Sequence, residues 1–424
     1  MNFNENMLTL THFSAGEVIN TTMGTVENGV VTNAEALSPE MKTFYDKTLI
    51  TLAGANLIHE QFGQKRPIPA NGGKTIEFRK FSRLPKAMKP LTEGVTPDGN
   101  KFNVSAVSCT VDQYGDYIEQ TDMLELTAVD NTIVEATKEL ASQAGITLDT
   151  VVRNELVAGT NVMYAPKVDG NGNETEILSR ADITKDCKLR VKDIFRAAAQ
   201  LKAVNAPKIN GSYVAIVHPY VAYDLMQEAG EKWVGIQKYA SPENILKGEI
   251  GTIGGVRFVE STEAKVFGPE EIADGFSRLT VAADANSTTT VTVNEYMDDE
   301  TFSSGKSVYI GGNENTVTRV NGNTVTLSSA VTLKKGDIIS GIGGGKDGSA
   351  VFATLFLGEN AYGVTDIEGG GLQHIVKPRG YGNDPLNQRS SIGWKATKVA
   401  KRLLEEYIVR VESGTEFSMT TENN

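Results

Sequence analysis

Few residues in this sequence have the types and spacing that catalysis or ligand binding requires. The glycine-rich segment GIGGGKDG at 341–348 is similar to a phosphate-binding loop, in which backbone N–H groups surround phosphate oxygens. Such a loop needs glycine where Ser340 stands, and serine or threonine where Asp347 stands. We therefore interpret 341–348 as a flexible hinge.

A second segment begins like a calcium-binding loop. Side-chain oxygens occur at alternate positions in Asp169, Asn171 and Asn173. The sixth position of that loop must be glycine and the twelfth a bidentate glutamate, but Glu174 and Arg180 stand there. A solvated turn is the better interpretation.

Histidines and cysteines are too scattered to indicate a catalytic or metal site. The four histidines have no metal-ligand spacing, and His218, which precedes a proline, is better interpreted as structural than as a general base. Cys109 and Cys187 form no CxxC pair, and the sequence has no GxSxG motif. We expect no enzyme, no catalytic residue, no metal and no cofactor.

The composition predicts a soluble globular protein of two or three domains. The chain has 424 residues, of which 40% are hydrophobic and 22% charged, with a formal net charge of −12. An acidic surface repels nucleic acid and argues against a general nucleic-acid binder. No apolar run is long enough to span a membrane, and the N-terminal sequence has neither a basic region nor an apolar region of a signal peptide.

Two neighbouring segments carry opposite charge. Between Lys65 and Lys89 there are eight basic residues and one acidic residue, Glu77, while residues 112–139 hold eight acidic residues and one basic residue, Lys138. We interpret the pattern as head-to-tail pairing between copies of the chain, because complementary charge orients such contacts. The alternatives are a solvated strand pair and a surface for single-stranded nucleic acid.

Periodicity and composition predict the elements that position these charges. Pro and Gly punctuation around short strand-like runs predicts a long two-stranded excursion at 63–105. Ser38 and Pro39 predict a helix start, continuing to Ile58. An apolar stripe that includes Leu140, Leu148, Val151 and Leu156 predicts a helix of more than 25 residues.

The second half of the chain changes from a segment with helical and strand patterns to a segment without helical periodicity. We expect a helix at 192–203, a buried strand at 213–217 and a helix at 220–227. Residues 272–347 are rich in threonine, valine and glycine without helical periodicity, and Asn321-Gly322 predicts a hairpin. We interpret these residues as an inserted all-β module. The expected fold class of the whole chain is α+β.

Five sequence strings occur along the chain in an order similar to that found in one known protein family. They are LTEGVTPDG at 91–99, YVAIVHPYVAYDL at 213–225, GEIGTIGGVRFVEST at 248–262, FLGENAYGV at 356–364 and DPLNQRSSIGWKATKVAKRLLEEYIVRVES at 384–413. With the element order above, they resemble the major capsid proteins of tailed phages, of the short-tailed coliphage type, whose fold also forms the herpesvirus capsid floor. The resemblance covers almost all of the chain except 272–347.

The resemblance implies a domain organisation for the whole chain. It implies an N-terminal arm at 1–45, a helix at 46–62, an extended loop at 63–105, a peripheral domain at 106–165 and 350–424, an axial domain at 166–271 and an inserted all-β domain at 272–347. Part of the C-terminal segment could return to the axial domain in this scheme.

The resemblance also implies a function and partners. Copies would form the pentamers and hexamers of an icosahedral phage head around double-stranded DNA, without sequence-specific contact and without a membrane. Scaffolding, portal and decoration proteins would be partners, and assembly in the bacterial host cytoplasm would place the protein in the virion. An encapsulin-like nanocompartment shell, and an enzyme or surface-binding protein with an accessory β module, are the alternatives.

Within such a shell, the extended loop of one copy would lie over the acidic start of a neighbour's long helix. The basic candidates for this contact are Arg79, Lys80, Arg83, Lys86 and Lys89. The acidic candidates are Asp112, Asp116, Glu119, Asp122 and Glu125.

Overall fold

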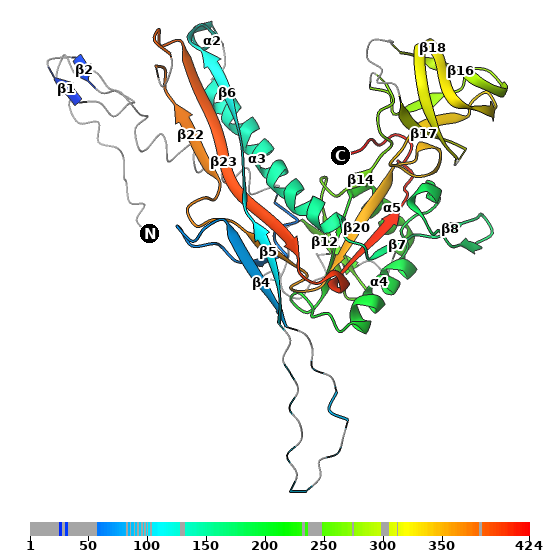
Figure 1. Ribbon diagram of the computed structural model, residues 1–424, viewed down its shortest axis with the longest axis horizontal. Helices are drawn as coiled ribbons and strands as arrows, with labels where there is room; N and C mark the ends of the chain where they lie inside the picture. Colours follow the sequence, from blue (N-terminus) through cyan, green and yellow to red (C-terminus); the bar gives the residue numbers. More distant parts are fainter. Residues whose placement is uncertain are drawn as a thin grey trace, which may run out of the picture. The chain divides into compact units, whose positions relative to one another are not determined.

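A computed structural model gives the arrangement of the chain (Figure 1). It describes residues 57–81, 104–127, 132–230, 234–235, 248–273, 275–297, 305–311, 313–380 and 384–424, with 25–27, 30–32 and ten single positions between 84 and 101. The chain divides into two compact units. Unit 1 comprises residues 1–57, 112–147 and 366–398, and unit 2 comprises 58–111, 148–365 and 399–424.

The described part of unit 1 is built on a three-stranded antiparallel sheet. Its strands are β6 (Asp112–Thr121), β22 (Gln373–Lys377) and β23 (Arg389–Arg402), which continues into unit 2. β23 is central, because Trp394 is opposite His374 of β22 and also opposite Asp116 of β6. The short helix α2 (Asp122–Thr127) follows β6 directly.

The long helix α3 (Thr132–Val157) confirms the predicted helix of more than 25 residues. It begins in unit 1 and ends in unit 2, and Figure 1 draws its first turns beside β6 and β23. Leu140, Leu148 and Leu156 are buried as the stripe predicts, but the residue buried beside them is Val152, while Val151 is half-buried. Val152 lies four residues from both Leu148 and Leu156, so it is closer to the centre of the buried face.

Unit 2 contains an eight-stranded mixed sheet. Its order is β11 (Val234–Gly235), β12 (Glu249–Ile253), β13 (Val256–Glu260), β10 (Tyr213–Val217), β20 (Val351–Leu357), β24 (Ile408–Ser413) and β7 (Val162–Tyr164), and β14 (Val266–Phe267) also pairs with β20. β10–β13 and β24–β7 are parallel, and the other pairs are antiparallel.

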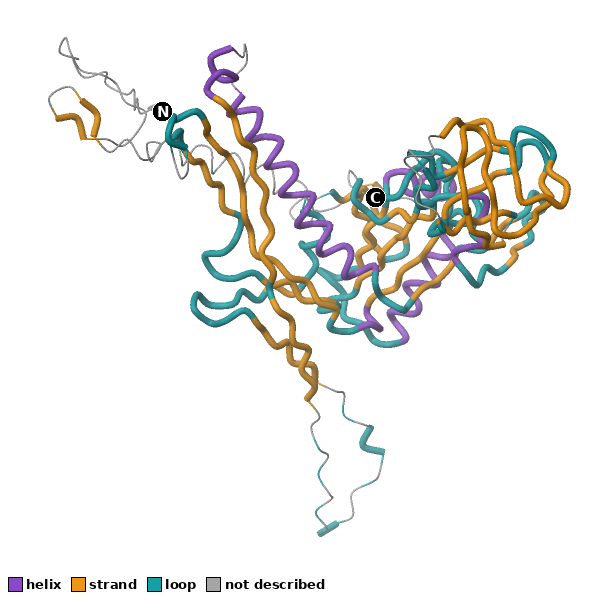
Figure 2. Tube along the Cα trace, turned by 45° about the horizontal axis from the view of Figure 1, so that its top comes forward, coloured by secondary structure: helices purple, strands orange, loops and turns teal. Residues whose placement is uncertain are grey.

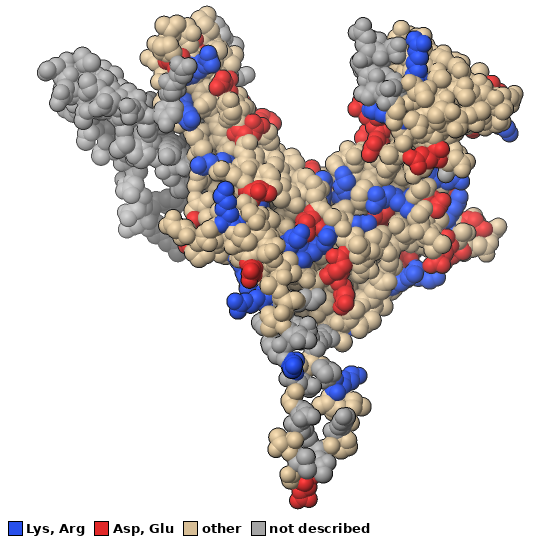
Figure 3. All heavy atoms as spheres, in the orientation of Figure 1, with Lys and Arg blue, Asp and Glu red and all other residues tan. Residues whose placement is uncertain are grey.

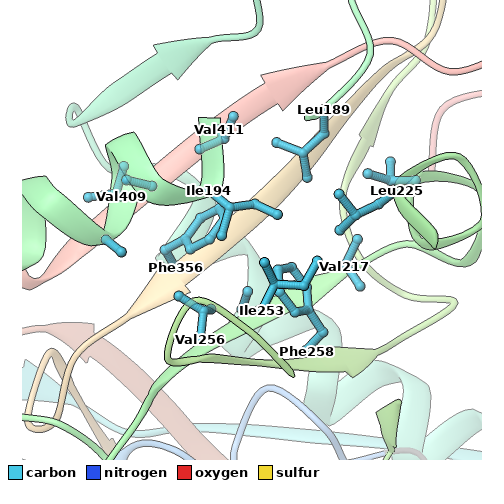
Figure 4. Packing of buried hydrophobic residues seen from close by; sticks show 14 of the residues in the cluster. Leu189, Ile194, Val217, Leu225, Ile253, Val256, Phe258, Phe356, Val409 and Val411 are labelled. Carbon is cyan, nitrogen blue, oxygen red and sulfur yellow. The ribbon is translucent and has the colours of Figure 1, made fainter. Parts of the chain in front are cut away.

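Both faces of this sheet are covered, which explains why β10 and β20 are buried at every position. Helices α4 (Val191–Ala203) and α5 (Pro219–Ala229) pack on one face, where Ile194 lies near Phe356 and Leu225 near Val217 in one apolar cluster (Figure 4). The opposite face packs on the end of α3. The strand at 213–217 and both flanking helices are therefore confirmed.

A separate five-stranded sheet lies within the segment predicted as an all-β module. Its strands are β15 (Arg278–Thr280), β16 (Ala285–Met297), β17 (Lys306–Ile310), β18 (Asn313–Leu333) and β19 (Ile338–Gly341), in the order β15-β19-β17-β18-β16. Val291, Val308, Val325 and Ile339 belong to its own apolar core.

The predicted hairpin at Asn321-Gly322 is confirmed inside β18. Asn315 Nδ2 donates to the Ser329 carbonyl over 3.1 Å, and Thr318 Oγ1 donates to the Thr326 carbonyl over 3.0 Å. Because a straight strand rises about 3.3 Å per residue, these bonds require the chain to reverse between them. Gly322, with φ of 59°, stands at the reversal.

Two further strands, β21 (Tyr362–Thr365) and β3 (Gln64–Lys65), continue the sheet of β6, β22 and β23 to five strands, and the other strands form short pairs. β3 is parallel to β21, which is antiparallel to the end of β23. The other pairs are β1 (Thr25–Glu27) with β2 (Val30–Thr32), β4 (Thr75–Phe81) with β5 (Val104–Thr110), and β8 (Lys167–Val168) with β9 (Glu174–Thr175).

The predicted helix at 46–62 differs from the structure where it is described. Residues 57–62 form turns and coil, while 46–56 lie outside the described residues, as does most of the predicted arm. Within the described chain, no helix is both long and apolar enough to cross a bilayer.

Candidate assembly surfaces

The hairpin of β4 and β5 is anchored at its root by Phe78. This side chain is 2% exposed and packs against β21 at Gly363, where an added Cβ would lie 2.5 Å from the Phe78 ring. The guanidinium carbon of Arg66 lies 6.0 Å from the ring centroid. Glycine at 363 therefore allows the hairpin to pack closely on β21.

Beyond Phe78 the hairpin becomes an exposed two-stranded ribbon (Figure 2). Arg79, opposite Ala106 in the register, is exposed, and so are Val104, Ser105 and Ala106 on β5. A two-stranded ribbon on its own is marginally stable in water. A further surface that covers the ribbon would stabilise it.

The structure describes only part of the predicted basic group. Arg79 and Lys86 are exposed and form no ion pair with another described residue. Lys80 lies on β4, but its side chain is outside the description, and Arg83 and Lys89 lie outside the described residues altogether.

The predicted acidic group lies along β6 and into α2. Asp112, Asp116 and Glu119 are exposed on β6, and Asp122 is half-buried at the start of α2. Glu125 lies within α2, and nothing is described of its side chain. β6 is an edge strand of the described sheet, and nine of its ten residues are not buried. A strand this exposed presents both side chains and backbone groups to a partner.

Asp116 belongs to a hydrogen-bond chain that joins β6, α3 and β23. Gln143 Nε2 donates to Asp116 Oδ2 over 2.6 Å, and Trp394 Nε1 donates to Gln143 Oε1 over 3.0 Å. Gln143 and the Tyr117 N–H, which donates over 2.8 Å, lower the pKa of Asp116. The carboxylate is thus held charged at the sheet surface.

The turn from β6 into α2 is fixed by its own side chains. Thr121 Oγ1 accepts a hydrogen bond from the Leu124 N–H over 3.3 Å, and Asp122 Oδ1 accepts one from the Met123 N–H over 2.8 Å. These bonds satisfy N–H groups at the helix start, which lack partners inside the helix.

Exposed apolar side chains accompany both charged groups, and the charge pattern alone did not predict them. Tyr117 is 64% exposed and Met123 62% exposed in the acidic region, with Ile118 and Leu124 also exposed. Met88, in the basic segment, is 79% exposed. The sequence signal was present as Tyr-Ile and Met-Leu pairs inside an acidic run, but periodicity does not separate these from core residues.

Two of the residues considered for chemistry, His218 and Asp169, have structural roles. His218 caps α5, since its Nδ1 accepts from the Tyr220 N–H over 3.2 Å, and burial lowers its pKa to about 4. Burial raises the pKa of the Cys109 thiol. The described residues include no group of three His, Cys, Asp or Glu side chains that could hold a metal ion. Asp169 accepts N–H bonds from Asn171 and Asn173, which makes it the centre of a turn.

Comparisons with known proteins match this chain to phage capsids. A family model described as "Phage capsid protein" matches residues 64–383. The capsid of Ralstonia phage GP4 is 12% identical, with a TM-score of 0.53, covering 85% of this chain and 88% of that chain, and this likeness shows a shared fold.

Two further solved structures are similar at lower scores. The capsid of Cyanophage P-SCSP1u is 13% identical with a TM-score of 0.49, covering 85% of this chain and 89% of that chain. The head of Helicobacter pylori bacteriophage KHP40 is 11% identical with a TM-score of 0.46, covering 98% of each chain. No curated protein matches the sequence.

Proposed function

The chain belongs to the phage capsid protein family and is a tailed-phage major capsid protein, and we propose that its copies form the pentamers and hexamers of an icosahedral head around double-stranded DNA. The α+β fold expected from the sequence is the tailed-phage major capsid fold.

The observation that carries the proposal is the exposed β4–β5 hairpin. Its root is fixed by Phe78, while Arg79 and Lys86 beyond the root have no ionic partner in their own subunit among the described residues. A ribbon with a rigid root and unpaired cations suits a contact with an acidic surface on another copy. β6 supplies such a surface through Asp112, Asp116 and Glu119.

Charge and apolar area have different roles in this contact. An exposed ion pair contributes about 0–1 kcal/mol and is screened by salt. Burying a leucine or methionine side chain contributes about 1.5–3 kcal/mol. Met88 on the loop, with Tyr117 and Met123 beside the acidic group, would therefore supply most of the binding free energy, and the charges would set register and orientation.

The remaining partners follow from this assembly. A net charge of −12 keeps a shell lining from adhering tightly to the packaged DNA, so we propose contact without sequence specificity. Scaffolding, portal and decoration proteins would complete the particle. Assembly would take place in the bacterial host cytoplasm.

Electron microscopy and size-exclusion chromatography test this proposal. The full chain should form closed shells, tubes or capsomer rings when it is expressed in bacteria, alone or with the scaffolding protein of its own phage. Monomers under both conditions, in protein that is folded by circular dichroism, would refute the proposal.

A further inference from the structure

A cavity in unit 2 is lined by basic side chains from distant parts of the chain. Its volume is about 430 Å³, and its lining includes Arg180 of the short 3-10 helix η1 (Arg180–Asp182), Lys265 and Phe267 around β14, and Arg410 of β24. The end of α3 contributes Asn154 and Val157, and Ala158 and Gly159 follow the helix. On the face drawn in Figure 3, Lys and Arg gather in the region where Figure 1 draws β7, β14 and β20.

Three cations surround the ring of Phe267. The guanidinium carbon of Arg180 lies 3.4 Å from the ring centroid, Lys265 Nζ lies 5.7 Å away, and the guanidinium carbon of Arg410 lies 5.8 Å away. The negative face of an aromatic ring attracts cations, which helps to hold like charges together. The ring of Phe267 thus lies at the point where the three basic groups come together.

One buried side-chain carboxylate, Glu412, faces these cations. Arg180 donates to it from Nε over 2.8 Å and from Nη2 over 2.6 Å, and Arg410 Nε lies 2.9 Å from Glu412 Oε1. Arg410 Nη1 also donates to the carbonyl oxygens of Val157 and Gly159. The two arginines are therefore held in place by the fold.

Lys265 has no side-chain carboxylate of the described residues within 4.0 Å. It donates to Oδ1 of Asn423 over 3.0 Å and to the backbone oxygen of Asn424. Among the described residues, these three cations face one side-chain carboxylate, Glu412, so positive charge is in excess. It would remain in excess if the Asn424 backbone oxygen also carried a negative charge. Burial, followed by repulsion from Arg153 and Arg180, lowers the pKa of Lys265 to about 8.

We propose that this cavity binds a phosphate-type oxyanion, which compensates the excess charge of Arg180, Lys265 and Arg410. Guanidinium groups bind phosphate oxygens through paired N–H groups, and an ammonium group adds a point charge. Such an oxyanion could be free inorganic phosphate or a phosphate group of a nucleic-acid backbone. The site lies within unit 2, and it does not depend on the proposed assembly.

Titration calorimetry on the full-length folded subunit tests the site with inorganic phosphate and with a short DNA duplex, at equal ionic strength. Lys265→Met removes the cation that no carboxylate side chain holds, and it should weaken binding by about tenfold or more. Lys208→Met is the matched control, since Lys208 is an exposed lysine near an aromatic ring, with Nζ 5.9 Å from the Tyr213 centroid. This control should bind as the wild type does.

Each outcome has a definite meaning. If inorganic phosphate binds and Lys265→Met removes that binding, the result supports the site and shows that the free anion is a sufficient ligand. If only the duplex binds, and Lys265→Met removes that binding, the result supports the site with a backbone phosphate as its ligand. Binding of neither probe, or equal weakening by Lys208→Met, overturns the proposal, whether or not the chain forms shells.

A measurement on the wild type provides a test that requires no variant. Sulfate keeps its charge between about pH 7 and about pH 9.5, whereas Lys265 loses its proton as the pH rises through its pKa of about 8. The other groups around it that carry or could carry charge are Arg153 of α3, Arg180 of η1, Arg410 and Glu412 of β24, Glu263 and the backbone oxygen of Asn424. The ordinary pKa values of arginine and carboxyl side chains lie outside this range. Sulfate affinity should fall across this interval, and a constant affinity would overturn the proposal.

Discussion

His59 and Asp149 form a fully buried pair that connects the segment before the hairpin to α3. His59 Nδ1 lies 2.6 Å from Asp149 Oδ2, and the His59 backbone N–H donates to Asp149 Oδ1 over 2.7 Å. Both side chains have no exposed area, and the Tyr362 hydroxyl donates to the His59 carbonyl oxygen. The pair fixes the chain immediately ahead of β3 and the hairpin.

Asp149→Ala should lower the free energy of unfolding by about 3 kcal/mol or more, because it leaves buried N–H groups of His59 without an acceptor. Urea denaturation of the unassembled subunit measures the change. Asp149→Asn keeps one acceptor oxygen and should cost less. Equal stability of Asp149→Ala and the wild type would show that the pair does not stabilise the fold.

Gly363→Ala should loosen the root of the hairpin, since its Cβ would lie 2.5 Å from the Phe78 ring. We expect faster proteolytic cleavage within residues 75–110 of the unassembled subunit. Gly170→Ala is the matched control, because no heavy atom lies within 4 Å of a Cβ at that position. Cleavage at the wild-type rate in Gly363→Ala would contradict the packing of Phe78 on β21.

Gln143→Ala should raise the pKa of Asp116 toward its ordinary value, because the side-chain hydrogen bond of Gln143 is the largest cause of the lowered pKa. A lowered carboxyl pKa means that the contribution of Asp116 to stability is present above its unfolded pKa and is lost as the pH falls through the lower folded pKa. NMR titration of the Asp116 carboxyl carbon measures the shift. An unchanged pKa in the variant would contradict the assigned bond.

Arg278→Ala should release the C-terminal segment from β15. Arg278 Nη2 donates to the Thr421 carbonyl over 2.7 Å, its Nη1 forms an ion pair with Glu422, and its Nε donates to the Gly348 carbonyl over 2.8 Å. Hydrogen exchange at residues 415–424 should become faster, while exchange in β20 stays slow. Unchanged exchange at 415–424 would show that Arg278 does not hold this segment.

Elements defined by local pattern could be predicted from the sequence, as β10, α3 and the Asn321-Gly322 reversal show. Their signals are periodicities and turn residues within a short window. The burial of Val152 was not predicted, because apolar residues at three- and four-residue spacing leave Val151 and Val152 almost equally suited to the buried face of the helix. The opposed charges of the basic and acidic segments were equally visible, because each is a run in the sequence.

Relationships between distant residues could not be predicted in the same way. The contact of Phe78 with Gly363 joins parts of the chain separated by 285 residues, and Glu412 meets Arg180 across 232 residues. No local pattern marks such pairs, because they depend on how the sheet of unit 2 brings its strands together. The exposed Tyr117 and Met123 were missed for a related reason, since exposure becomes visible only when the neighbouring elements are in place.

We propose that the basic loop of one copy contacts the acidic strand β6 of another. Arg79→Glu, Arg83→Glu and Lys86→Glu together should abolish closed shells while the subunit stays folded, because like charges would then face each other. Lys167→Glu, Lys202→Glu and Lys208→Glu together make the same change in net charge on exposed lysines elsewhere, and these variants should still assemble.

Restoring opposite charge provides the most direct measurement. Asp112→Lys and Glu119→Lys, added to the triple loop variant in one chain, should recover particles that electron microscopy counts under conditions where the wild type forms shells. Recovery of shells in the combined variant is the predicted result. Normal shells from the triple loop variant, or no recovery in the combined variant while each subunit remains folded, would contradict the contact.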